Sequence, residues 1–218
     1  MNHDHLPTNP APNEASTPRL SIKIVGVGSA GLAVVERLLP LGLDAVEFVA
    51  VNTDPVSLAS SSVSTRILLE SKLLRGLGTG GDPERGRKLA EEQLPKFKAL
   101  FDGVSAVFIV AGLGGGAGTG ASHVIAKAAR ESGALTLGFV TTPFECEGSR
   151  RRSIALDGLH ALKTAADGVI CLPNQRVLKL IDENTSIVDT FKTSNQLLAE
   201  GYQCAYSVTI FSAAPPCN

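Results

Sequence analysis

The chain has 218 residues, of which 44% are hydrophobic, so it can bury a sizeable core in one large domain or a tight pair of domains. Its formal net charge of −1 argues against a general binder of nucleic acids or membrane surfaces, and no apolar run is long enough for direct membrane insertion. The amino terminus lacks the apolar segment of a signal peptide, and the four cysteines form no CxxC pair. We therefore expect a cytoplasmic protein with reduced thiols.

The amino-terminal residues 1–19 are rich in Pro, Asn, Ser and Thr, which predicts a disordered tail. His3 and His5 within it are expected to be solvated rather than to bind a metal. From Leu20 onward, apolar runs alternate with helical periodicity. Strands are predicted at 20–28, 45–54, 66–71, 105–112, 134–143 and 168–173, and helices at 30–39, 83–101 with a bend at Pro95, 118–132, 150–165, 175–181 and from about 187. This alternation indicates an α/β fold with a doubly wound, mostly parallel sheet covered on both faces.

A first glycine loop follows the first predicted strand. The sequence GVGSAG places Gly26, Gly28 and Gly31 in a G-x-G-x-x-G pattern before a helix, where backbone N–H groups can bind phosphate. Asp54, at the end of the second strand, lies where the ribose-binding acid of a dinucleotide fold would lie. The alternative is a tight strand–helix turn that binds no ligand.

A second loop, AGLGGGAGTG at residues 111–120, also joins a buried strand to a helix. It contains no Gly-Lys-Ser/Thr, so it is not a Walker A loop. Glycines let the backbone approach an anion and direct successive N–H groups toward it, and Thr119 adds a hydroxyl donor. We interpret the loop as a polyphosphate cradle, with a flexible hinge as the alternative. Two such loops at neighbouring strand ends suggest that one nucleotide is bound from both sides.

These motifs resemble the tubulin/FtsZ GTPase family, and its FtsZ branch most closely. The resemblance lies in GGGAGTG at residues 114–120 and extends over about residues 20–203. It is specific because several motifs follow one another in family order: IKIVGVGSAG, FVAVNTD, GLGTGGDPERGR, FIVAGLGGGAGTG, TTPFECEG and CLPNQRVLKLID. The resemblance implies a GTPase domain, a long central helix and a second domain, with bound GTP or GDP and Mg²⁺ and with subunits stacked head to tail.

The resemblance also assigns site residues by their place in the motifs. The two loops are expected to hold the phosphates, Asn52, Asp54 and the loop at residues 78–83 to border the γ-phosphate, and Glu147 and Arg151 to contact the ribose and nucleotide. Asn174 is expected to bind the base and Phe191 to stack on it. The full set is Gly28, Ser29, Ala30, Gly31, Ala33, Asn52, Asp54, Gly114, Gly115, Gly116, Ala117, Gly118, Thr119, Gly120, Glu147, Arg151, Asn174, Phe191 and Gln196.

Several of these residues have simpler interpretations on the residues alone. Glu147 and the run Arg150–Arg152 could form a solvated helix start, and the three arginines compete for one register. Phe191 could belong to the core, and Asn174 could cap a helix. No residue is assigned as a catalytic group or as a protein ligand of a metal.

The sequence departs from the family pattern at both ends of the expected site. Ser29, Ala30 and Ala33 replace the usual glycines and asparagine of the first loop, and Gln196 stands where we expect the carboxylate that reads guanine. The central helix loses its pattern after Gln203, and neither the acidic activating loop nor the second domain follows. We divide the chain into a tail at 1–19, a GTP-binding domain at 20–186, the start of the central helix at 187–203 and a divergent end at 204–218.

The sequence therefore predicts a GTP-binding protein of the bacterial cell-division filament that binds nucleotide but cannot activate hydrolysis in a neighbour. Its expected partners are other copies of itself or full-length FtsZ, head to tail, and division-ring proteins. One alternative is a non-catalytic module that binds or caps FtsZ filaments. A less favoured alternative, suggested by GVGSAG, is an NAD-dependent oxidoreductase, which would leave the second glycine loop unexplained.

Overall fold

The computed structural model describes residues 20–43, 46–70, 78–182 and 185–213, and the predicted tail lies outside them. Six parallel strands form one sheet in the order β3-β2-β1-β4-β5-β6. The strands are β1 (Ile22–Val27), β2 (Val46–Asn52), β3 (Thr65–Leu68), β4 (Ala106–Gly112), β5 (Leu135–Thr142) and β6 (Gly168–Pro173). The helices are α1 (Gly28–Leu38), α2 (Pro55–Ala59), α3 (Pro83–Glu92), α4 (Leu94–Phe101), α5 (Gly116–Glu131), α6 (Ser149–Ala165), α7 (Asn174–Val177) and α8 (Ile187–Ala213), with 3₁₀ turns at Leu39–Leu41 and Glu145–Glu147. The expected α/β fold with a parallel sheet is confirmed.

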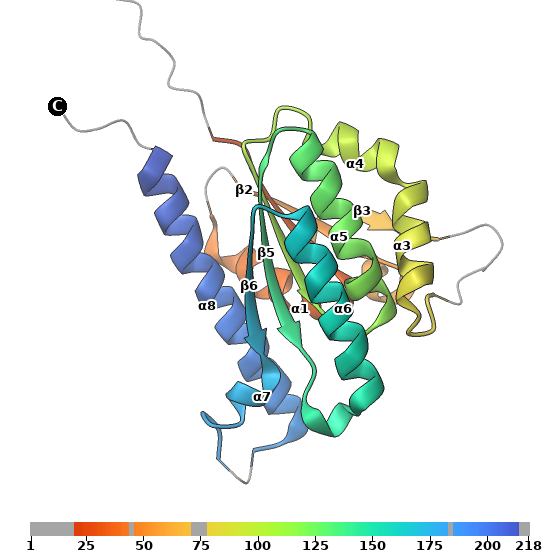
Figure 1. The fold of residues 1–218 in the computed structure, drawn as a ribbon. Helices are drawn as coiled ribbons and strands as arrows, with labels where there is room; N and C mark the ends of the chain where they lie inside the picture. Colours follow the sequence, from red (N-terminus) through yellow and green to blue (C-terminus); the bar gives the residue numbers. More distant parts are fainter. Residues whose placement is uncertain (1–19, 44–45, 71–77, 183–184, 214–218) are drawn as a thin grey trace, which may run out of the picture.

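Helices cover both faces of the sheet, as Figure 1 shows. On one face, α3, α4, α5 and α6 bury a core with the inward side chains of β1, β2 and β4. On the other face, α1 and α8 pack over the remaining strand side chains. Strands β1 and β4 are covered on both sides, which explains why they are nearly continuous apolar runs in the sequence.

Helix α8 is anchored to the sheet by one aromatic cluster. The ring of Tyr202 is fully buried and meets the rings of Phe108 and Phe139 edge-on, with centroids 5.0 and 5.9 Å apart. Leu198 and Ala199, about one turn earlier, are also buried. The apolar stripe of this helix therefore finds its partner in the sheet itself. Because Tyr202 holds α8 against the sheet, the direction of the turns before it is fixed, and these turns reach the candidate site.

Among the helices, three differences from the sequence-based expectation matter most. The helix expected at 83–101 is two helices, which break at Gln93, so Pro95 lies in the first turn of α4, where its missing N–H costs nothing. Helix α7 is a single turn, shorter than the 175–181 expected. Helix α8 continues to Ala213, beyond Gln203, where we expected the pattern to end.

The strand order reverses between β1 and β4, which are adjacent in the sheet but far apart in the sequence. In an open parallel sheet, a crevice forms outside the carboxyl ends of the strands at such a switch point. Both glycine loops follow these two strands directly. Among the described helices, none combines the length and the apolar character that crossing a bilayer requires. Cys146 and Cys171 are free thiols.

Candidate nucleotide-binding site

A cavity of about 480 Å³ lies at the carboxyl ends of the strands and is lined from every loop that the sequence singled out. Its size is within the usual range for small-molecule sites. Of the predicted residues, its lining includes Gly28, Ser29, Ala30, Asn52, Asp54, Gly114, Gly115, Gly116, Ala117, Gly118, Glu147, Arg151, Asn174 and Phe191. Gly31, Ala33, Thr119, Gly120 and Gln196 are not part of it.

The two glycine loops meet at the floor of the cavity. Gly28 has a φ of +70°, and a Cβ built on it would lie 3.1 Å from the Gly118 nitrogen. Only glycine combines this backbone conformation with so close an approach. The loop after β1 and the loop after β4 are therefore two sides of one floor rather than two separate sites.

Two helices open into this floor with uncapped amino termini. Val27 precedes α1 and Gly115 precedes α5, and neither provides a side-chain cap. The first N–H groups of a helix lack intrahelical partners, and the helix dipole adds positive potential there. By contrast, Asp54 caps α2 and Asp82 caps α3. The first N–H groups of α1 and α5, at the floor of the cavity, thus have no side-chain cap and can bind an anion.

The five predicted residues that do not line the cavity either pack against other elements or lie on other surfaces. A methyl group on Gly31 would come closer than 3.0 Å to the Val110 carbonyl oxygen, and one on Gly120 would do the same to the Pro83 carbonyl oxygen. These glycines let α1 approach β4 and let α5 approach α3. Ala33 lines a neighbouring hollow between α1 and α2. The Thr119 hydroxyl, expected to donate to a phosphate, accepts the Gly114 N–H at 2.8 Å and does not line the cavity.

Asn52 supplies a buried donor at the end of β2. Its side chain is 2% exposed, and its Oδ1 accepts the Thr53 N–H at 2.8 Å. Its Nδ2 has no hydrogen-bond partner in the described part of the chain. A buried amide left unpaired is costly, so a ligand oxygen in the cavity would stabilise this group.

Asp54, on the same side, is already engaged. Its carboxylate accepts the Val56 N–H at 3.0 Å and also binds the Ser57 hydroxyl. These hydrogen bonds, from the Ser57 hydroxyl first and then the Val56 N–H, hold the pKa of Asp54 below its ordinary value. The residue therefore acts as a helix cap, which weakens the ribose-binding role that a dinucleotide fold would give it.

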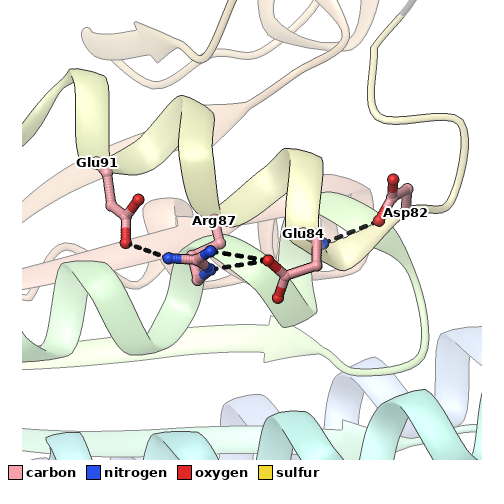
Figure 2. A network of polar contacts seen from close by, with 4 residues as sticks. All are labelled: Asp82, Glu84, Arg87 and Glu91. Carbon is pink, nitrogen blue, oxygen red and sulfur yellow. Dashed lines mark hydrogen bonds and ion pairs between the residues drawn. The ribbon is translucent and has the colours of Figure 1, made fainter.

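The loop before α3 closes the far wall of the cavity through Thr79, Gly80 and Gly81. Asp82 ends this loop and accepts the Glu84 N–H at 2.9 Å. Figure 2 shows how the exposed face of α3 continues from there, with Arg87 bound by Glu84 on one side and by Glu91 on the other. A methyl group on Gly116 would collide with Thr79, so α5 and this loop are in close contact.

Glu147 and Arg151 form the side wall. Arg151 donates to Glu147 Oε2 at 2.7 Å, and Glu147 Oε1 accepts the Phe144 N–H at 2.8 Å. Of the three consecutive arginines, only Arg151 lines the cavity. Arg151 is therefore the arginine whose position agrees with the expected contact. The pair presents one carboxylate and one guanidinium to whatever occupies the middle of the cavity.

The last wall comes from α7 and the first turns of α8. Asn174 is buried, and its Oδ1 accepts the Ser194 hydroxyl at 2.5 Å. Phe191 is 40% exposed and meets Phe144 edge-on, with centroids 5.2 Å apart. Asn195, one turn after Phe191, also lines the cavity. An aromatic face and two amides gather here, a set that can stack on a flat ring and form hydrogen bonds with its edge.

Asn195 lines the cavity, but the sequence analysis did not predict it. That analysis assigned the neighbouring Gln196 to the base. Residues four apart share a helix face, so Asn195 follows Phe191 into the cavity. Gln196 is turned away and donates to Glu200 Oε1 at 3.0 Å on the outer face of α8. The spacing of four residues between Phe191 and Asn195 is the sequence signal that would have identified Asn195. In this arrangement the Gln196 side chain does not line the cavity.

The chemistry of the lining suits a ligand that carries its own anionic groups. Within residues 20–43, 46–70, 78–182 and 185–213, no three His, Cys, Asp or Glu side chains gather as a metal site. Mg²⁺ in phosphate sites is held largely by the phosphates and by water, with one or two carboxylates.

Comparison with known proteins matches this arrangement. The model of the "Tubulin/FtsZ family, GTPase domain" matches residues 21–182. An empty FtsZ dimer from M. jannaschii is 36% identical with a TM-score of 0.80, and covers 84% of this chain and 53% of its own. The W319Y variant of FtsZ from M. jannaschii is 38% identical with a TM-score of 0.79, covering 84% of this chain and 55% of its own. CetZ2 from Haloferax volcanii, solved as a GTPγS-bound protofilament, is 28% identical with a TM-score of 0.74, covering 83% and 56%. The chain spans about half the length of these structures.

Proposed function

The chain belongs to the tubulin/FtsZ family, in its GTPase domain, and on that premise we propose that its cavity binds GTP or GDP. The phosphates would lie on the floor formed by the loops after β1 and β4. The ribose would lie beside Glu147 and Arg151, and the base between Phe191 and the amides of Asn174 and Asn195. Mg²⁺ would bind with the phosphates and would offset their negative charge.

One observation carries this proposal: two uncapped helix amino termini face one cavity. Helices α1 and α5 both leave their first N–H groups without a side-chain partner, and the unpaired Nδ2 of Asn52 lies nearby. A neutral ligand would leave this convergent positive potential unused. A polyphosphate satisfies the N–H groups and the dipoles together, without needing a lysine in the loop.

Glycine at 115 allows this proposal to be tested separately from folding. Gly115 has an extended backbone, with φ −103° and ψ −179°, and a Cβ there would meet nothing within 4 Å. Gly115→Ala is therefore expected to fold normally and to place a methyl group in the phosphate region. We expect its affinity for GTP to fall by about tenfold or more, the equivalent of one lost hydrogen bond to a charged group.

The measurement is equilibrium binding of GTP, GDP, ATP and NAD⁺ with Mg²⁺, together with the melting temperature of the free protein. Gly201→Ala, on α8, is the matched control because its Cβ would also meet nothing within 4 Å. Binding of guanine nucleotides by the wild type and the control, with loss in Gly115→Ala, supports the proposal. Equal binding of guanine nucleotides by the wild type and both variants, or binding of NAD⁺ alone, contradicts it.

We also propose that the chain binds GTP without turning it over efficiently on its own. The two carboxylates that line the cavity are both occupied, Asp54 by the amino terminus of α2 and Glu147 by Arg151 and a backbone N–H. Both carboxylates are thus engaged in positioning the protein itself, and neither is set apart as a general base. An acid from another molecule would have to complete the site, as in a head-to-tail contact with a second copy or with full-length FtsZ.

This second proposal separates a filament subunit from a capping module, both in the cytoplasmic cell-division machinery. Single-turnover GTP hydrolysis is measured for the chain alone and after addition of full-length FtsZ, with cosedimentation measured in parallel. Slow turnover that rises with FtsZ supports a subunit that receives an activating acid. Cosedimentation without turnover favours the non-catalytic module. Efficient hydrolysis by the chain alone contradicts the proposal.

A further inference from the structure

Behind the phosphate floor lies a buried contact that the expected binding roles do not explain. The Thr119 side chain is 4% exposed and lies on α5, one turn inside its amino terminus. Its hydroxyl oxygen accepts the Gly114 N–H at 2.8 Å. This N–H is consequently donated within the protein and is not available to a ligand. Thr119 acts on the loop, not on the cavity.

Gly114 needs such a fixed partner. Its φ is +105°, and a Cβ built on it would lie 3.1 Å from the Arg151 carbonyl oxygen and 3.2 Å from the Pro143 side chain. The loop therefore turns sharply between α5 and the start of α6. One buried hydrogen bond at Gly114 decides how Gly115 and Gly116, which line the cavity, are presented.

Helix α6 keeps the Thr119 side chain in place from the other side. Gly158 is buried in the middle of α6, where glycine normally costs about 0.5–1 kcal/mol relative to alanine. A methyl group at this position would come closer than 3.0 Å to Thr119 Cγ2. Position 158 holds a glycine because the Thr119 methyl group occupies the space that a Cβ would fill.

We infer that Thr119 is a positioning residue for the phosphate loop and that Gly158 is the position on α6 that permits its side-chain orientation. The inference rests on the proposed nucleotide site. The Thr119 oxygen holds Gly114, and Gly114 sets the path of the loop that lines the cavity. The Thr119 methyl group packs against Gly158, so the loop and the middle of α6 are sterically coupled.

Substitutions at the two positions test this coupling in both directions. Thr119→Val keeps the shape and removes the acceptor, so the affinity for GTP should fall about tenfold. Thr119→Ser keeps the oxygen and should bind like the wild type. Gly158→Ala should displace the threonine methyl group and weaken binding. The double variant Gly158→Ala with Thr119→Ser removes the clash and should restore binding.

Two control variants distinguish positioning from a general loss of packing. Thr136→Val removes a hydroxyl from another buried threonine, which donates to the Ala134 carbonyl at 3.0 Å at the far end of β5. Gly201→Ala adds a methyl group to a helical glycine in open space. Both controls should bind GTP like the wild type, whatever small changes in melting temperature they cause.

Amide hydrogen exchange at Gly114 supplies a readout that needs no nucleotide. Exchange should be faster in Thr119→Val and Gly158→Ala than in the wild type, and slow again in the double variant. If the wild type binds GTP but Thr119→Val binds equally well, or if the double variant fails to restore binding, the inference is wrong. If the wild type binds no nucleotide, the proposed function itself fails and the inference fails with it.

Discussion

The two ends of the cavity are built in different ways. The phosphate end is made of backbone, held by glycines that have no room for a side chain, such as Gly28 against Gly118. The base end is made of side chains on α7 and α8, and its aromatic residue Phe191 is 40% exposed. A substitution at the tightly packed glycines of the phosphate end is expected to change folding and binding together, whereas one at Gly115 or at the base end changes binding alone. Stability and affinity are therefore coupled at these packed glycines and separable elsewhere in the cavity.

The largest expected effect is at Gly118, where the two loops meet. A methyl group there would come closer than 3.0 Å to the Gly112 carbonyl oxygen, and both partners are backbone in regular elements. Gly118→Ala should lower the free energy of unfolding by about 1–3 kcal/mol and should also abolish GTP binding. Urea denaturation of the free protein measures the first effect. An unchanged midpoint would show that the phosphate end is not rigid.

Phe191 should give the opposite pattern at the base end. Phe191→Ala is expected to weaken GTP binding about tenfold, because base stacking on an aromatic ring contributes about 1–3 kcal/mol. Its free energy of unfolding should fall by less than about 1 kcal/mol, since the residue is 40% exposed and its ring meets Phe144 edge-on. Val188→Ala, also exposed on α8, is the control. A large loss of stability would remove the distinction between the two ends.

Asn195 and Gln196 sharpen the comparison within a single helical turn. Asn195→Ala should reduce the preference for GTP over ATP by about tenfold, because an amide in the cavity can pair with the edge of guanine. Gln196→Ala should leave the preference unchanged, since its side chain pairs with Glu200 on the outer face. Competition binding with ATP measures both variants. The reverse result would reinstate Gln196 as the base-reading residue.

The smallest expected effect is a pH dependence of stability that arises from His123 on α5. Burial is the main cause that lowers the pKa of His123 on α5 below its ordinary value. The unfolded chain therefore binds the proton more readily, so stability is lost as the pH falls below about 6.5. His123→Gln should flatten this dependence in thermal denaturation. Val188→Ala, at an exposed position without a titratable group, should leave the slope as it is.

The sequence predicted the fold well because its signals were local and repeated. Continuous apolar runs marked the buried strands, and each glycine loop stood between a strand and a helix. Helix ends were less predictable: a Pro at 95 suggested a bend, but the chain ends one helix at Glu92 and starts another at Leu94. A proline tolerated in a first turn and one that kinks a helix look alike in the sequence.

The site residues show the same limit more clearly. Gly115 and Gly120 belong to one motif, yet Gly115 lines the cavity and Gly120 lets α5 approach α3. A glycine that makes room for a ligand and one that makes room for a neighbouring helix look the same in the sequence. Only the packing of the folded chain distinguishes them. Asn195 and Gln196 differ by one position, which on a helix is a rotation large enough to exchange cavity for solvent.

The pairing of β1 with β4 also bears on the order in which the molecule forms. Residues 22–27 pair with residues 106–111, so β2, β3, α3 and α4 all lie between the two partners along the chain. Contacts of such long sequence separation form slowly and late, because a large loop must close first. The two glycine loops are brought together only by this pairing. The cavity therefore cannot exist in a partly folded chain, and the gain of nucleotide binding during refolding would report completion of the central sheet.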